Sequence, residues 1–387
     1  MRPTRERITL VAALSPGDQL EELLKQSILV AILLLSGCSN GAQSVPANNA
    51  AATLQSVAAT RDAVGPDTFE VWVCNVPSKT IDPIYGDLPL RLDLDPNHVA
   101  AQLNMVVSPY FSTISNDLYQ PRFIAGHTLT MAVMERHDEC VERAVKSSSS
   151  AADAVLVIAN AEHIASSPGG WGRAGTACSS QRRCPATDTA RAAYIGGSDF
   201  HPVWGDAPAV DLIEHEIGHT LGLPHSGDIA DEHASALDVM SNSAAPREVN
   251  PQQRNGPDTL AINRFALGWL PIAALTIAGP DGGSFTVSPS TGPTGTRLVI
   301  LPITDHSLLT VEYLPDDGFD DFLPHGGIAI HVVDQNSPGL RVTVGAPAPF
   351  TQLLNNPGDS VTTNDWHVTV AAHSVGSMQV DAVPTSG

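Results

Sequence analysis

The sequence has few basic residues, and lysine is almost absent from it. Only three lysines occur among 387 residues, and 41 acidic residues against 20 Lys and Arg give a formal net charge of −21. Such a chain repels the phosphate backbone of nucleic acids and offers no basic cluster that would neutralise it. We therefore expect no nucleic-acid partner, and no attachment to anionic membranes through a polybasic patch.

Aromatic residues and long apolar runs are also scarce. Aromatics make up 5% of the chain, which argues against a platform of rings for glycan binding. The apolar run at 28–35 is far shorter than the roughly 20 residues that span a bilayer. Hydrophobic residues still account for 42% of the chain and charged residues for 16%, so the sequence predicts a folded, loop-rich protein with room for two domains.

The N-terminal apolar run is typical of a signal peptide. It ends in Leu-Ser-Gly-Cys at 35–38, which resembles the lipobox of bacterial lipoproteins, where Cys38 would carry the lipid and begin the mature chain. The acidic pair Glu21 and Glu22 is unusual before such a run and indicates an over-extended start. We expect an exported protein, held in the bacterial cell envelope by its lipid alone or released. The alternative is a buried apolar helix with an incidental cysteine.

Four cysteines remain after Cys38, an even number that suits an oxidising compartment. Cys178 and Cys184 would close the shortest loop, leaving Cys74 to pair with Cys140, although three pairings are open. No CxxC spacing occurs, so we expect neither a cysteine-rich zinc site nor a redox motif.

Composition divides the chain into four parts. Residues 1–37 form the signal peptide, and 38–66, rich in Ala, Ser, Asn and Pro, are predicted to be a flexible tether. Residues 67–270 mix strand and helix patterns. Residues 271–387 alternate short strands with Gly, Pro and Asp turns, which predicts an all-β, sandwich-like domain.

Hydrophobic periodicity gives the elements of the third part. We expect strands at 69–73, 122–133, 154–159 and 191–195, and a helix at 96–107 opened by Asp95. A second helix should begin near Asp206 and Pro208 and bury Val210, Ile213, Ile217 and Leu221.

That second helix carries the motif HEIGHTLGLPH, an HExxHxxGxxH pattern that starts at His215. His215 and His219 project from one side of a helix because residues four apart are neighbours. Gly222 permits a left-handed turn that brings His225 back toward them. Three neutral imidazoles leave one position of a zinc ion open, as catalytic zinc sites require. We expect one catalytic Zn²⁺.

Glu216 follows His215 directly and is too constrained to join it as a ligand. A zinc-bound water has a pKa near 7, and a carboxylate within hydrogen-bond reach can take its proton as the water attacks a carbonyl. We therefore expect Glu216 to be the general base of peptide-bond hydrolysis.

The motif and the segment after it resemble the metzincin metallopeptidases. Asp-Val-Met-Ser at 238–241 is similar to the methionine turn beneath the zinc ligands of that family, with Met240 as its methionine. Residues 263–270, which end in Leu-Gly-Trp-Leu, resemble gametolysin-like and immune-inhibitor-A-like members. The resemblance implies an α+β catalytic domain with a twisted mixed sheet and an active-site helix. The sequence departs from the family pattern at Asn242, where some metzincins carry a tyrosine.

A glycine-rich stretch at 169–177 lies where the edge strand of a metzincin would bind an extended substrate. Trp171, Gly172 and Ala174 are the candidate residues of that edge. The alternative is a mobile surface loop without a role in binding.

Two acidic segments have less specific patterns. Asp228, Asp231, Glu232 and His233 form either a solvated loop or a wall of the specificity pocket. Asp316, Asp317, Asp320 and Asp321 are a possible Ca²⁺ site or, alternatively, a solvated turn without EF-hand spacing.

Taken together, these features predict a monomeric zinc metalloendopeptidase that acts on protein or peptide substrates outside the cytoplasm. Two alternatives remain. One is a catalytically inactive lipoprotein that binds through the metzincin fold, and the other is an adhesive protein that uses its β-domain.

Overall fold

The computed structural model describes residues 54, 63–86, 91–164, 167, 169–175, 190–227, 231–304, 306–334, 341–344 (backbone only) and 353–385. The expectations for the signal peptide, Cys38, Cys178 and Cys184 lie outside these residues. The described residues belong to one compact unit. Within them, no helix has both the length and the apolar character needed to cross a membrane.

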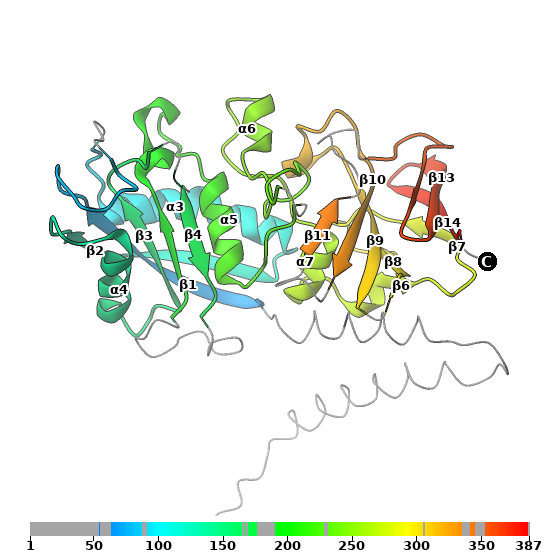
Figure 1. Ribbon diagram of the computed structural model, residues 1–387, viewed down its shortest axis with the longest axis horizontal. Coiled ribbons are helices and arrows are strands. Elements are labelled where there is room, and N and C mark those ends of the chain that lie inside the picture. Colours follow the sequence, from blue (N-terminus) through cyan, green and yellow to red (C-terminus); the bar gives the residue numbers. More distant parts are fainter. Residues whose placement is uncertain are drawn as a thin grey trace, which may run out of the picture. The chain divides into compact units, whose positions relative to one another are not determined.

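The first sheet has five strands in the order β2-β1-β3-β5-β4 (Figure 1). The strands are β1 (Gly65–Asn75), β2 (Tyr119–Thr130), β3 (Ala154–Ala159), β4 (Gly170–Arg173) and β5 (Ala192–Ile195). Neighbouring strands are parallel except β4, which runs antiparallel to β5 at the edge. The sheet is therefore mixed, and all four strand expectations overlap one of its strands.

Helices cover both faces of this sheet. Alternate side chains of β3 point in opposite directions, so Leu156 and Ile158 join the core under α3 (Pro96–Ile114) and α5 (Asp211–Thr220). Val155 and Val157 pack instead against α4 (His137–Ser147). A disulfide between Cys74 of β1 and Cys140 of α4 fastens this second layer to the sheet.

The folded part begins earlier than the tether prediction at 38–66 allows. Leu54 and Ala63 are buried, and β1 already begins at Gly65. The amide of Ala63 donates to the Leu267 carbonyl at 3.0 Å, and the Ala63 carbonyl accepts from the Trp269 indole at 2.7 Å. These bonds satisfy a buried indole N–H, which composition alone does not reveal.

After α6 (Ala245–Val249) and α7 (Ala261–Ala266) the chain is almost entirely β-structure. One sheet has the order β11-β10-β9-β8-β6 and the other β12-β13-β14-β7. Their strands are β6 (Leu275–Ile277), β7 (Gly283–Val287), β8 (Leu298–Pro302), β9 (Ser307–Leu314), β10 (Gly327–Asp334), β11 (Arg341–Val344), β12 (Ser360–Thr363), β13 (Trp366–Ser374) and β14 (Ser377–Pro384). Short 3₁₀ turns occupy Gly197–Phe200, Pro202–Trp204, Ile272–Ala274 and Gly318–Asp320.

The two C-terminal sheets share a core, and the first of them also packs on the N-terminal part. Val299 and Leu301 of β8 join Val368 and Val380 of the second sheet. The intervening Leu298 and Ile300 face the other way, into the core that contains Trp269. The protein is thus an α+β structure with a β-rich C-terminal region, and its parts are connected by a continuous apolar interior.

Candidate metal centre

Helix α5 begins at Asp211, several residues after the start expected near Asp206 and Pro208. The amides of Val210 and Asp211 both donate to the Arg254 carbonyl, at 2.8 and 3.1 Å. The preceding amide, of Ala209, donates to the Asp199 carbonyl at 3.0 Å. These long-range hydrogen bonds keep the residues before Asp211 out of the helix. The Asp206 and Pro208 pattern could not predict them, because they depend on tertiary structure.

The three histidines of the motif come together. His215 and His219 lie one turn apart on α5, and Gly222 has a φ of 92°, the left-handed turn expected there. The Nε2 atom of His219 lies 3.1 Å from that of His215 and 3.0 Å from that of His225. One ring nitrogen of each histidine therefore lies close enough to the others to share a metal ion.

The other ring nitrogens fix the tautomers. Nδ1 of His215 lies 2.7 Å from the Val239 carbonyl, and Nδ1 of His219 lies 2.8 Å from the Leu223 carbonyl. A carbonyl can only accept, so both Nδ1 atoms carry the proton and donate it. Both Nε2 atoms then present lone pairs to each other, an arrangement that a shared cation relieves. Tetrahedral ligands at zinc distances would lie about 3.3 Å apart, so the residues fit a zinc ion.

The charge states of the rings suit a metal as well. Burial lowers the pKa of His215 to about 3 and that of His219 to about 4, and the neighbouring histidines add to the effect. Both rings are therefore neutral at neutral pH, which is the form that binds a metal.

Glu216 follows His215 on α5 in a buried position, and its Oε2 atom has no hydrogen-bond partner within the described structure. Burial raises its pKa to about 8. A cation among the three histidines would favour the ionised carboxylate and lower that pKa again. A buried carboxylate oxygen without a partner is suited to accept a proton.

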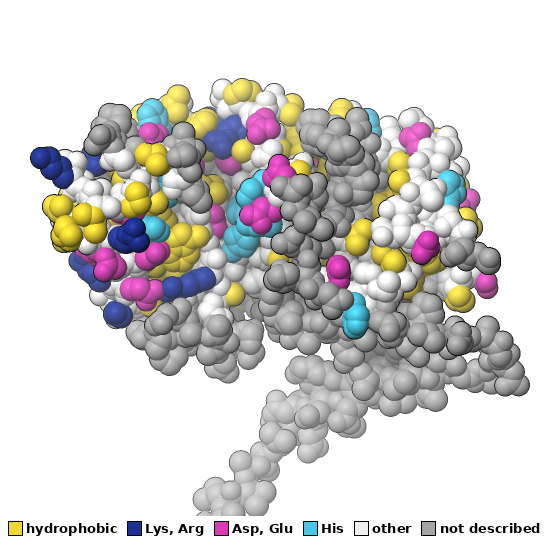
Figure 2. All heavy atoms as spheres, in the orientation of Figure 1, with side chains coloured by type: hydrophobic (Ala, Val, Ile, Leu, Met, Phe, Trp, Pro, Cys, Tyr) yellow, Lys and Arg dark blue, Asp and Glu magenta, His cyan; other side chains and the backbone are white. Residues whose placement is uncertain are grey.

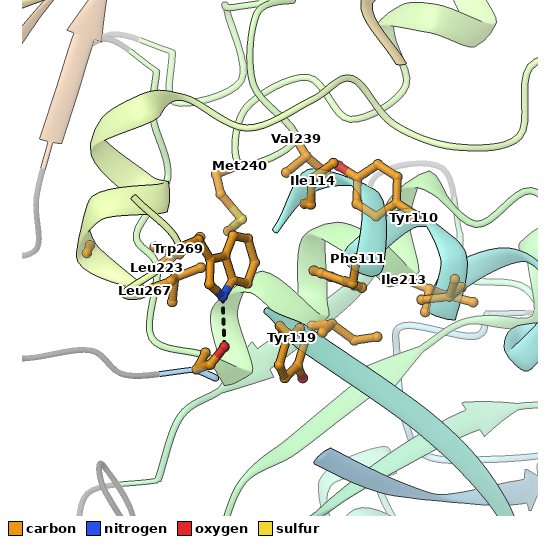
Figure 3. Close-up of a cluster of buried hydrophobic side chains, with 14 of the residues drawn as sticks. Tyr110, Phe111, Ile114, Tyr119, Ile213, Leu223, Val239, Met240, Leu267 and Trp269 are labelled. Atoms are coloured by element: carbon orange, nitrogen blue, oxygen red, sulfur yellow. Dashed lines mark hydrogen bonds between the residues drawn. The ribbon is translucent and has the colours of Figure 1, made fainter. Parts of the chain in front are cut away.

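The segment around Met240 supports the motif from below. The Val239 carbonyl accepts a hydrogen bond from His215 Nδ1, and the Met240 carbonyl accepts one from the Ser226 amide at 3.1 Å. Met240 is fully buried, and a Cβ on Gly218 would lie 2.3 Å from its sulfur. Figure 3 shows Met240 in one hydrophobic cluster with the Trp269 ring. Met240 thus packs against Gly218, on the helix that carries His215 and His219.

Strand β4 lies directly against α5. A Cβ on Gly172 would be 2.2 Å from the Glu216 carbonyl oxygen, and one on Gly170 would be 3.1 Å from Glu216 Oε1. The glycines are therefore required by the approach of the helix. Trp171 points to the other face, where its ring stacks on Tyr194.

The outer edge of β4 has hydrogen-bonding groups available. The Gly169 carbonyl accepts from the Gly196 amide at 2.8 Å, and pairing alternates along an antiparallel ladder. The amides and carbonyls of Gly170 and Gly172 therefore point away from β5. Among the described strands, none pairs with this side of β4. Ala174 follows the strand in the same outward phase.

Glu232 and His233, for which the sequence left a solvated loop or a wall of the specificity pocket open, both contact His225, and this contact was not predicted. Glu232 Oε2 lies 2.9 Å from His225 Nδ1, and the His233 ring lies 4.7 Å from the His225 ring. Histidine and acidic side chains lie side by side near the middle of the face in Figure 2. An acid seven positions after a ligand, in an irregular loop, has no periodic signal that would predict this contact.

The four aspartates of the possible Ca²⁺ site are not gathered around one point in the described structure. Asp320 is buried and accepts from the Asp258 amide at 2.9 Å, and Asp321 accepts from the Gln253 side chain at 3.1 Å. Asp316 and Asp317 are exposed. In the described part of the chain, the clusters of potential metal ligands are His215/His219/His225 and His225/Glu232/His233.

The chain was compared with protein-family models and with curated proteins, and neither comparison found a match.

Proposed function

We propose that the protein is a zinc-dependent endopeptidase of the metzincin type, with His215, His219 and His225 as zinc ligands and Glu216 as general base. The observation that carries this proposal is the convergence of three Nε2 atoms, of which those of His215 and His219 are left with lone pairs only by the carbonyl partners of their rings. The unpartnered, buried carboxylate of Glu216 beside them supports hydrolysis over a purely structural metal site.

A zinc ion bound there would supply a Lewis acid that acidifies water and polarises the scissile carbonyl. Glu216 would take the proton of the attacking water and return it to the leaving amine. The outward amides and carbonyls of Gly170 and Gly172 would bind the substrate backbone as an added strand, independently of its side chains. Helix α5 lies against β4, so these groups hold the peptide beside Glu216.

We further propose that the protein acts outside the cytoplasm, anchored by a lipid on Cys38. The lipobox-like sequence at 35–38 is its support. Mass spectrometry of the mature protein tests it, since an unlipidated chain that begins elsewhere would exclude the anchor.

Zinc content and peptide hydrolysis, measured on the same samples, test the activity. The wild-type chain should hold about one zinc ion, and His219→Ala should lose most of it. Glu216→Gln should keep the zinc but hydrolyse peptides about 10²- to 10⁴-fold more slowly. His306→Ala, which removes an exposed histidine outside the described clusters, is the matched control.

Two results would contradict the proposal. Full zinc in His219→Ala would move the metal elsewhere, and wild-type hydrolysis by Glu216→Gln would exclude the base. A zinc-loaded wild type that cleaves no member of a broad peptide library would favour the inactive, binding alternative.

A further inference from the structure

The third zinc ligand is held differently from the first two. His215 and His219 lie on α5 and donate to backbone carbonyls, which no side-chain substitution removes. His225 lies beyond the helix, and its Nδ1 meets the carboxylate of Glu232 at 2.9 Å. The orientation of this one ligand therefore depends on a side chain.

We propose that Glu232 is a positioning residue that orients His225 and strengthens zinc binding. The inference rests on the zinc site proposed above and deepens it. A carboxylate that accepts a hydrogen bond from Nδ1–H leaves Nε2 as the metal-binding atom. The negative charge of the carboxylate also increases the basicity of the ring. The side chain of Glu232 is 57% exposed, so its carboxylate is well solvated. Its effect on His225 therefore comes from the short, directed contact rather than from burial of the pair.

The backbone around Glu232 is built to keep it there. The loop after the motif returns so closely that a Cβ on Gly227 would lie 2.2 Å from the Glu232 carbonyl carbon. On the other side, the Ser241 hydroxyl donates to the Glu232 carbonyl oxygen at 3.2 Å. The residue is thus placed between the segment of the third ligand and the turn that contains Met240, both of which belong to the metal centre.

Zinc binding measured without any substrate tests the inference. Zinc affinity is determined by competition with a chelator for the wild type, Glu232→Ala and Glu232→Gln. We expect Glu232→Ala to bind zinc about 10- to 100-fold more weakly. Glu232→Gln should lie between the two, because its amide oxygen still accepts the proton but carries no charge. Glu248→Gln is the matched control, since it removes an exposed carboxylate of α6 that accepts from the Asn242 amide rather than from a zinc ligand.

The cobalt-substituted protein gives an independent signature. The visible spectrum of bound Co²⁺ should change in Glu232→Ala and stay unchanged in Glu248→Gln, because only the former substitution changes the orientation of a ligand, His225. Unchanged affinity and spectrum in a folded Glu232→Ala would overturn the inference while leaving the zinc peptidase intact. A wild type that binds zinc without hydrolysing peptides would contradict the proposed function alone. A wild type that binds no zinc would overturn both.

Discussion

Gly218, the fourth residue of the zinc motif, has no room for a side chain. Its position for a Cβ lies 2.3 Å from the sulfur of Met240, far inside contact distance. The glycine is needed because the turn that contains Met240 packs directly beneath the helix of the first two ligands. Gly218 has no side chain to take part in a reaction, and the packing of Met240 against the helix explains why glycine occupies this position.

Gly218→Ala should therefore destabilise the protein. Met240 is fully buried and must move to admit the new methyl group, and overpacking of this kind costs roughly 1–3 kcal/mol of unfolding free energy. Urea denaturation measures the loss. The double variant Gly218→Ala/Met240→Ala should lose less than the sum of the two single variants, because the shortened side chain makes room. Strictly additive losses would show that the two residues do not interact.

Single residues can be predicted from the sequence where the spacing of a motif determines their positions. The convergence of the three histidines follows from helical periodicity and one left-handed glycine, and the structure brings their rings together. Glu232 does not follow, because its contact depends on the path of a loop past Gly227 and Ser241. Tertiary contacts of that kind leave no local pattern.

Among the elements, β4 is the edge strand to which the proposed function assigns substrate binding. Its outward amides end at Ala174, which lies just after the strand and in phase with Gly170 and Gly172. A proline at that position removes one outward N–H without touching the ladder to β5.

Ala174→Pro should weaken the turnover of long peptides and leave the fold intact. The loss of one hydrogen bond, about 1 kcal/mol, corresponds to a roughly fivefold lower kcat/KM. Ala174→Gly keeps the amide and is the control for changes at this site. Zinc content and melting temperature should stay near those of the wild type. Equal turnover of long peptides by all three proteins would show that this edge does not bind substrate.

Elements were predictable where their apolar periodicity is strong. The buried strand β3 has the expected bounds, and the Asp95 cap marks the start of α3. Helix α4 was not expected, because charged residues are spread through its sequence and only Cys140, Val141, Ala144 and Val145 are buried. Such a narrow apolar stripe becomes meaningful only once the sheet and the disulfide to Cys74 are in place.

Across the whole molecule, buried polar groups add to the apolar contacts between the part that contains the three histidines and the C-terminal sheets. Glu312 of β9 accepts the amide of Ala261, the first residue of α7, at 2.8 Å. Its other oxygen has no hydrogen-bond partner within the described structure and lies 4.0 Å from His331 Nδ1. Burial lowers the pKa of His331 to about 4, so this neighbour is neutral and does not balance a charge on Glu312.

Burial raises the pKa of Glu312 to about 8, so the folded protein holds this carboxyl protonated at neutral pH. An unfolded chain ionises the same group near pH 4.3. Between these values the folded state binds the additional proton, and the stability that this provides is complete below about pH 4 and is lost as the pH rises to 8.

Glu312→Gln should remove this dependence, because an amide is neutral at every pH and its oxygen can still accept the Ala261 amide. The stability of the variant relative to the wild type should therefore increase from pH 5 to pH 8, by at most about 1.4 kcal/mol per pH unit. Urea denaturation of zinc-loaded protein at several pH values measures the difference, in which the pH dependence of zinc binding cancels. Glu248→Gln, on the surface, should show a constant difference from the wild type. The same constant difference for Glu312→Gln would mean that Glu312 is ionised in the folded protein and that the interior between the two parts admits its charge.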